Sequence, residues 1–224
     1  MNENAALRVK DLQFFRNSHQ IVRNLNFSLQ VGECLALVGV NGTGKSTLLN
    51  LLAGLLLPHR GQVLINGADI HLMPRLAKQQ LGFLPDQLPL YPELTVKEYL
   101  QLVAKLRHIP KTSQKEAIDN VLEDLHLTTY RHSLIGILSR GLKQRIGIAQ
   151  AIIHKPLVVL LDEPTQGLDP TQIENFQLLI AEKKKYAAIV LSTHHLSEVE
   201  MLHTKVMQLK HQDIPAYDTH DCPA

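Results

Sequence analysis

The sequence predicts an α/β fold in which a mostly parallel sheet is combined with an N-terminal antiparallel β layer and a helical insertion. Short, nearly continuous apolar segments recur in the second half of the chain, as expected of parallel strands buried on both faces. The N-terminal segments alternate more clearly between apolar and polar residues, which is typical of an antiparallel layer. Between Thr95 and Ile153, apolar residues recur at spacings of three and four, as in amphipathic helices.

Turns and apolar runs define the predicted strands along the chain. The segments "VGE" and "NG" supply turns in the first part of the sequence. The predicted strands cover residues 7–14, 21–29, 34–38 and 62–65, and then 81–85, 157–161, 187–192 and 205–209. The later ones are unusually apolar, which assigns them to the parallel sheet.

The helical insertion contains three predicted helices, written "TVKEYLQLVAKLRH", "SQKEAIDNVLEDLH" and "KQRIGIAQAIIH". Pro110 and the region of Gly136 separate them. Thr95 is the predicted N-cap of the first helix, because Glu98 stands three positions later, as in a capping box.

We expect residues 1–224 to form a single domain, because no internal repeat and no Pro/Ser-rich linker divides the sequence. The helical subdomain is expected at about 87–153, and the sheet-containing parts at 1–86 and 154–210. The segment 211–224 carries few apolar residues and is expected to be an extended tail.

Composition and charge exclude several classes of function. A net charge of +2 and an aromatic content of 4% argue against a nucleic-acid partner. The longest nearly apolar run, residues 48–57, falls well short of the ~20 residues of a spanning helix, so no direct membrane insertion is expected. The N-terminus does not resemble a secretory signal, and the two cysteines, Cys34 and Cys222, are not expected to form a disulfide. These features predict a cytoplasmic protein.

The segment "GVNGTGKST" matches the phosphate-loop pattern, Gly-x4-Gly-Lys-Ser. It follows the apolar strand "CLALV" and precedes the helical segment "STLLNLLAGLL", which is the context that this pattern requires. Backbone amides of such a loop surround phosphate oxygens, a lysine reaches the outer phosphates and a serine hydroxyl binds Mg²⁺. The expected nucleotide contacts are Gly39, Val40, Asn41, Gly42, Thr43, Gly44, Lys45, Ser46 and Thr47.

Two carboxylates follow a second apolar strand in "LVVLLDEPTQGLD". Asp162 and Glu163 are expected at the carboxyl edge of the sheet, where ligands bind in open α/β folds. Asp162 is the candidate Mg²⁺ ligand, and Glu163 is the candidate base that deprotonates an attacking water.

With these two motifs in place, the chain resembles the ATP-binding subunit of ABC transporters from about residue 7 to residue 209. "LSRGLKQRIGIAQAI" is similar to the signature sequence of that family, "GLD" at 167–169 resembles its D-loop, and "LSTHHLSEVE" places His194 at its switch histidine. The resemblance implies the ABC ATPase fold, which has a P-loop NTPase core. His195 is interpreted as having no role in the site.

The resemblance also implies a mechanism and partners. Glu163, His194 and Lys45 would be catalytic, with ATP and Mg²⁺ as cofactors. Two copies would form a head-to-tail homodimer in the ATP-bound state, in which Ser139 and Gly141 of one copy bind the γ-phosphate held by the other. The dimer would act at the inner face of the cell membrane on separate transmembrane permease subunits.

The sequence departs from the family pattern at two places. Where the family has the glutamine of its Q-loop, this chain has Asp86 followed by Gln87; Asp86 is the favoured Mg²⁺ ligand, and a shift of one residue would favour Gln87. For the aromatic residue that stacks on adenine, the candidates are Phe14, Phe15 and Arg16.

The leading functional hypothesis is ATP hydrolysis that powers transport, in the direction of export because the sequence resembles the exporter-type branch. The alternative is an ABC-type ATPase that drives another membrane process, such as regulation of cell-wall enzymes. A small-molecule P-loop kinase is disfavoured because such a kinase lacks the signature sequence. The sequence does not indicate the transported substrate.

Overall fold

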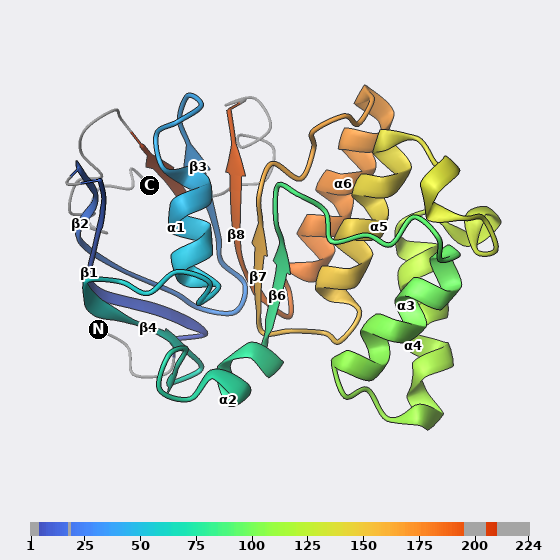
Figure 1. Cartoon of the computed structure of the whole chain (residues 1–224), viewed down its shortest axis with the longest axis horizontal. Coiled ribbons are helices and arrows are strands. Elements are labelled where there is room, and N and C mark those ends of the chain that lie inside the picture. Colours follow the sequence, from blue (N-terminus) through green and yellow to red (C-terminus); the bar gives the residue numbers. More distant parts are fainter. Residues whose placement is uncertain (1–4, 18, 195–204, 210–224) are drawn as a thin grey trace.

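We describe a computed structural model of the chain, covering residues 5–17, 19–194 and 205–209, in which the strands form two sheets (Figure 1). One sheet is parallel throughout and has the strand order β6-β7-β8-β3-β9. Its strands are β3 (Cys34–Val38), β6 (Leu81–Leu84), β7 (Val158–Leu161), β8 (Ala188–Thr193) and β9 (Lys205–Gln208).

The parallel sheet is buried on both faces, as its apolar strands predict. All five residues of β3 are buried, and their side chains alternate between two hydrophobic clusters. Leu35 and Leu37 pack on one face of the sheet, whereas Ala36 and Val38 pack on the other. This alternation follows from the two-residue period of a strand, and it places β3 in the interior of the molecule.

The second sheet is antiparallel, with the order β2-β1-β4-β5, and it lies near the N-terminal helix α1 (Figure 1). Its strands are β1 (Leu7–Arg16), β2 (His19–Leu29), β4 (Arg60–Ile65) and β5 (Ala68–Asp69). Its buried residues share one cluster with α1 (Lys45–Leu52) and one face of the parallel sheet.

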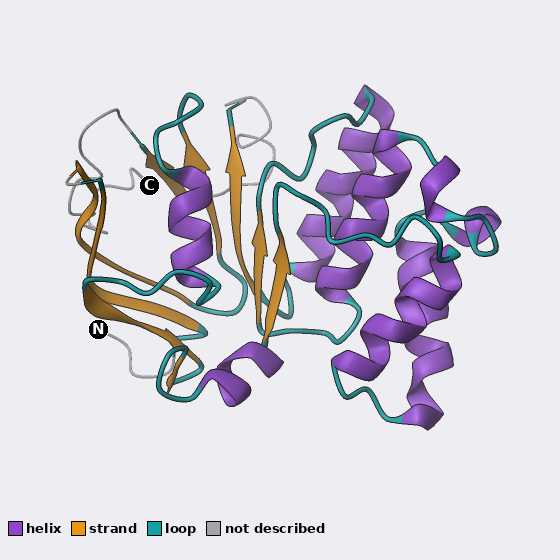
Figure 2. Cartoon of the chain, in the orientation of Figure 1, coloured by secondary structure: helices purple, strands orange, loops and turns teal. Residues whose placement is uncertain are grey.

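The other face of the parallel sheet shares one hydrophobic cluster with the later helices. They are α3 (Val96–Leu106), α4 (Lys111–Asp124), α5 (Arg140–Ile152) and α6 (Pro170–Lys183), and Figure 2 shows them gathered on the side away from the antiparallel layer. Helix α1 and helix α5 therefore lie on opposite faces of the parallel sheet.

Polar side chains cap three of these helices. The predicted capping box of α3 is confirmed: the Thr95 hydroxyl accepts from the Glu98 amide, and the Glu98 carboxylate accepts from the Thr95 amide at 2.9 Å. Ser139 caps α5 and Asp169 caps α6 with a single bond each, from the amides of Leu142 and Gln172 respectively. Each such cap is worth about 1 kcal/mol of helix stability.

The predicted strands are confirmed to within two residues at each end, and the three helices of the insertion are confirmed with shifted starts. The elements that were not predicted are β5, the short helix α2 (Pro74–Gln79), the 3₁₀ turns Thr128–Tyr130 and Ile135–Ile137, and α6.

Cys34 is buried in β3, and burial raises the pKa of its thiol to about 12, so it is unreactive. Cys222, His195 and the tail 211–224 lie outside the described residues.

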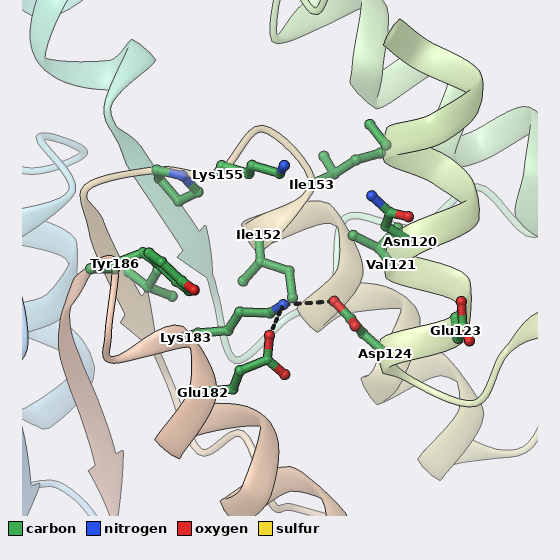
Figure 3. Close-up of a pocket in the computed structure, with 14 residues that line it drawn as sticks. Asn120, Val121, Glu123, Asp124, Ile152, Ile153, Lys155, Glu182, Lys183 and Tyr186 are labelled. Atoms are coloured by element: carbon green, nitrogen blue, oxygen red, sulfur yellow. Dashed lines mark hydrogen bonds and ion pairs between the residues drawn. The ribbon is translucent and has the colours of Figure 1, made fainter.

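A cavity of about 570 Å³ lies between α4, the end of α5 and the end of α6 (Figure 3). At this cavity, the Lys183 ammonium forms an ion pair with the Asp124 carboxylate, with an N–O distance of 2.7 Å, and also lies 3.5 Å from the Glu182 carboxylate. Both members of the Lys183–Asp124 pair are about three-quarters covered, so the pair is a fixed link between α4 and α6.

His154, just after α5, is a neutral, half-buried base. Its Nε2 lies 3.2 Å from the Leu81 carbonyl, and this distance fits an Nε2–H donor, which leaves the buried Nδ1 without a hydrogen-bond partner among the described residues. Burial, followed by the positive charge of Arg107, lowers the pKa of His154 from 6.5 to about 4, although the bond to Leu81 acts in the opposite direction. The unfolded chain therefore takes up a proton near pH 6.5 that the folded chain resists until about pH 4, so stability falls as the pH falls through this window.

Replacing His154 with Gln is expected to reduce this acid sensitivity, because an amide can donate to the Leu81 carbonyl and does not titrate. Between pH 7 and pH 5, the wild-type chain should lose on the order of 2 kcal/mol more unfolding free energy than the variant. Urea denaturation at the two pH values measures this difference. The exposed His132→Gln serves as the control and should behave as wild type. Equal acid sensitivity of His154→Gln and wild type would contradict the assignment.

Candidate functional site

The phosphate-loop segment joins the end of β3 to the start of α1, as predicted. Gly42 and Gly44 have φ values of +84° and +97°, in the left-handed region that glycine adopts without strain. Gly39 leaves no room for a side chain, because a Cβ there would lie 2.6 Å from the Leu209 carbonyl oxygen. Gly44 is also the N-cap of α1 and has no side chain to occupy the first amides of the helix, which remain available to an anion.

Lys45 is folded back over this loop. Its side chain is only 6% exposed, and its ammonium donates to the Gly39 carbonyl at 2.6 Å and to the Val40 carbonyl at 3.4 Å. The same ammonium lies 3.3 Å from the Glu163 carboxylate. Carbonyl and carboxylate oxygens thus surround the Lys45 ammonium, as the oxygens of a phosphate group would.

The Glu163 carboxylate lies between Lys45 and His194. One of its oxygens faces Lys45, and the other lies 2.9 Å from Nδ1 of His194. The Glu163 side chain is 13% exposed, whereas His194, at the end of β8, is 44% exposed. Glu163 therefore directly contacts the two other predicted catalytic residues, Lys45 and His194, which come from separate parts of the sequence, at the carboxyl edge of the sheet.

The backbone of Glu163 is held in an unusual conformation, with φ at +44°. A residue other than glycine in this region costs on the order of 1–3 kcal/mol and persists only where its surroundings hold it. The Glu163 amide donates to the Ser192 hydroxyl at 2.8 Å, and the Glu163 carbonyl accepts from the Gln144 side chain at 3.1 Å.

Asp162 is buried at the end of β7 and lies in the hydrogen-bond network with two serines. The Ser192 hydroxyl donates to its carboxylate at 2.6 Å, and Ser46 of the phosphate loop also bonds to it. Burial raises the pKa of Asp162 above its usual range, the two serine hydrogen bonds lower it, and the charges of Asp86 and Glu163 raise it. A divalent cation beside Asp162 would relieve the cost of burying its charge.

Ser46 and Asp162 thus meet as predicted for a Mg²⁺ site, and Asp86 lies near enough for its charge to act on Asp162. Asp86 and Gln87 are both exposed, so the choice between them stays open. Within residues 5–17, 19–194 and 205–209, no group of three or more His, Cys, Asp or Glu side chains could by itself hold a metal ion. Ser46 and Asp162 fit an ion that is also bound by phosphate oxygens.

Ser139 and Gly141 lie on α5, across the parallel sheet from Lys45. Ser139 is exposed, and its hydroxyl accepts from the Leu142 amide at 3.3 Å, so it is the N-cap of α5. Gly141 is buried against the D-loop segment: a Cβ there would lie 3.1 Å from the Gly167 carbonyl and 2.9 Å from the Gln172 side chain. The bare backbone of Gly141 therefore allows α5 to approach its own D-loop segment.

Among the candidates for adenine stacking, Phe14 is buried and packs its ring edge to face with His59, with centroids 5.4 Å apart. Phe15 and Arg16 are exposed. The structure therefore assigns Phe14 to the core and leaves the other two as candidates.

Sequence reasoning missed Ser192 and Gln144. Ser192 is the polar residue at the carboxyl end of the apolar segment "AAIVLS", so its position beside Asp162 could have been inferred from the parallel sheet. Gln144 lies within the quoted signature segment, but its contact with Glu163 depends on how α5 packs against the loop after β7.

Comparisons with known proteins agree with this geometry. Residues 22–166 match the family model described as "ABC transporter". The chain is 37% identical over 196 residues to the uncharacterized ABC transporter ATP-binding protein YxlF of Bacillus subtilis, covering 88% of this chain and 65% of that protein. It is also 37% identical over 198 residues to the bacitracin transport ATP-binding protein BcrA of Bacillus licheniformis, covering 88% and 64% of the two chains.

The chain thus spans slightly less than two thirds of the length of these two relatives. Among solved structures, an ATP-binding subunit of an ABC transporter superimposes with a TM-score of 0.87 at 32% identity, covering 96% of this chain and 90% of that one. The predicted fold class is therefore confirmed.

Proposed function

This chain belongs to the ABC transporter family, whose domain is an ATPase domain, and on that premise we propose that it binds and hydrolyses ATP to power transport through separate membrane subunits. The observation that carries the proposal is the position of the Glu163 carboxylate, which lies between Lys45 of the phosphate loop and His194 at the end of β8. The proposed base, Glu163, thus contacts both the phosphate-binding cation, Lys45, and the proposed γ-phosphate sensor, His194, at one edge of the sheet.

Lys45 and the loop amides bind the phosphates in this proposal. The carbonyls of Gly39 and Val40 and the Glu163 carboxylate hold the Lys45 ammonium, and phosphate oxygens would replace part of this set. The other nucleotide contacts in this proposal come from the same segment and are Gly39, Val40, Asn41, Gly42, Thr43, Gly44 and Thr47.

Ser46 and Asp162 would hold Mg²⁺, which neutralises phosphate charge during transfer. Ser192 orients the Asp162 carboxylate by its 2.6 Å hydrogen bond. Asp86 is retained as the further candidate ligand, because its charge acts on Asp162.

Glu163 accepts the proton of the attacking water, and His194 orients the Glu163 carboxylate and contacts the γ-phosphate. In the structure, one Glu163 oxygen already faces His194, so release of Lys45 to the phosphates leaves the other oxygen available to water. Binding of phosphate by Lys45 would thus free Glu163 to act as the base.

We place the second half of each site on another copy of the chain. Ser139 is exposed at the N-terminus of α5, which lies on the opposite face of the sheet from α1, the helix that begins with Lys45, and an exposed hydroxyl is accessible to a second copy. In the ATP-bound homodimer, Ser139 and the backbone at Gly141 of one copy would complete the site that contains Lys45 of the other.

The membrane partners, the direction of export and the peripheral position at the cytoplasmic face are part of the proposal. No helix within the described part of the chain is long and apolar enough to cross a bilayer. The similarity to a bacitracin transport protein supports export, and the substrate is expected to be chosen by the permease subunits.

The shared-site arrangement is tested with Ser139→Asp. Aspartate is as good an N-cap as serine, so α5 should stay intact, whereas its charge should repel the partner's γ-phosphate. Ser139→Asn is the matched control, because it caps the helix without a charge.

The test uses two mixed dimers in a Glu163→Gln background that retains ATP. In one, the first copy carries Lys45→Ala and the second carries Ser139→Asp; in the other, a single copy carries both changes. Shared sites predict that only the first dimer retains ATP after gel filtration, because one of its composite sites is intact. Retention by the second dimer instead, or equal retention by both, would refute the shared geometry.

A further inference from the structure

We propose that Gln144 is a positioning residue that fixes the peptide carrying Glu163, and thereby aims the Glu163 carboxylate during ATP hydrolysis. This inference rests on the proposed function, because it assigns a residue that acts on the catalytic base. Gln144 lies in the second turn of α5 and is only 6% exposed. A buried amide of this kind must have hydrogen-bond partners, and its partners reveal its role.

The Gln144 amide binds two successive carbonyls of the loop after β7. Its Nε2 donates to the Glu163 carbonyl and to the Pro164 carbonyl, both at 3.1 Å. The two N–H groups of one amide can satisfy two acceptors at once, so both donors of Gln144 are committed to this loop.

The peptide on the other side of Glu163 is held by a different element. The Glu163 amide donates to the hydroxyl of Ser192, which belongs to β8 and is fully buried. Helix α5 and strand β8 therefore hold the two sides of Glu163, which explains how its φ of +44° is maintained.

This geometry determines where the carboxylate points. With its backbone fixed on both sides, the Glu163 side chain reaches Lys45 with one oxygen and His194 with the other. If Gln144 released the loop, the Glu163 carbonyl would keep its bond from the Gln166 amide, at 3.1 Å, but would lose its tie to α5, and the backbone could relax toward negative φ. The carboxylate would then leave the position from which it reaches both partners.

Helix α5 offers an internal control. Gln150 is also on α5, is 7% exposed, and donates its Nε2 to the Phe83 carbonyl of β6 at 2.7 Å. It is thus the same chemical group, on the same helix, with the same kind of bond, but its acceptor belongs to a strand of the sheet and not to the loop that carries Glu163. Loss of either amide should destabilise the chain, and only loss of Gln144 should affect the base.

The experiment compares Gln144→Met with Gln150→Met in the full chain, because methionine keeps the length of glutamine without its donors. We expect Gln144→Met to lower the single-turnover rate of ATP cleavage by about tenfold or more, while the Kd for ATP changes by less than about twofold. Gln150→Met should show a similar loss of thermal stability with a cleavage rate close to wild type. If Gln144→Met does not fold, Gln144→Asn, which keeps the amide but shortens its reach, takes its place.

A double mutant separates positioning from general destabilisation. In the Glu163→Gln background, Gln144→Met should lower the residual cleavage rate no further, because no base is left to position, although it should still lower the unfolding midpoint. A wild-type cleavage rate in folded Gln144→Met, or an equal loss in Gln150→Met, would overturn the inference and leave the proposed function standing. A wild-type chain that cleaves no ATP would overturn the proposed function and this inference with it.

Discussion

Glu163→Gln is expected to bind ATP and to hydrolyse it at a rate reduced by about 10²–10⁴-fold, the usual contribution of a general base. The amide has nearly the shape of the carboxylate, so contacts to Lys45 and His194 can persist, but it cannot accept the proton of water. Because the change also removes the negative charge that faces Lys45, ATP affinity should be equal to that of wild type or higher.

Steady-state phosphate release and calorimetric titration with ATP measure the two effects separately. Glu182→Gln, which removes the same charge from an exposed side chain of α6, is the control and should hydrolyse ATP as wild type does. Normal turnover in Glu163→Gln would remove Glu163 from the mechanism.

Lys45→Ala is expected to weaken ATP binding by about 10–100-fold, because charge-assisted hydrogen bonds to phosphate contribute roughly 1.5–3 kcal/mol. The change should also lower the thermal stability of the nucleotide-free protein, since the Lys45 ammonium bonds the Gly39 carbonyl within the loop. Lys45→Ala should also leave the partly buried Glu163 carboxylate with His194 as its remaining partner among the contacts described above.

Calorimetry on the variant checks the affinity, and thermal unfolding without nucleotide checks the effect on the loop. Lys205→Ala, which breaks the 2.7 Å pair with Glu33, is the matched control: it removes a lysine and an ion pair that are not in the phosphate loop. Unchanged ATP affinity in Lys45→Ala would contradict the phosphate-binding role.

The sequence predicted most of the fold because its strands are strongly patterned. The continuous apolar run of β3 indicates a strand that is buried on both faces. The alternation of apolar and polar residues along β1 and β2 indicates strands that are buried on one face. The capping of α3 was also predicted, because a cap depends on residues within one helical turn.

Helix α6 was missed although its signals were present. Asp169 caps it, Pro170 occupies its first turn and Lys183 its last, in agreement with the rules for helix ends. The short elements β5 and α2 carry too few residues for a periodic pattern.

The catalytic contacts were predicted where a motif places a residue at the sheet edge, as with Lys45, Glu163 and His194. The hydrogen bonds that hold the Glu163 backbone were not predicted. They come from Gln144 of α5 and Ser192 of β8, and such contacts between distant segments depend on packing. Likewise, local sequence could not separate Phe14 from Phe15: both rings contact His59, and only packing into the hydrophobic core decides which one is buried.

The proposed shared ATP site is tested most directly by sedimentation of Glu163→Gln with Mg²⁺ and ATP, alone and with the proposed membrane partner. A dimer is expected with ATP and monomers with ADP, because only ATP carries the γ-phosphate that Ser139 of the second copy would bind. A chain that binds ATP and stays monomeric under both conditions would contradict the shared site.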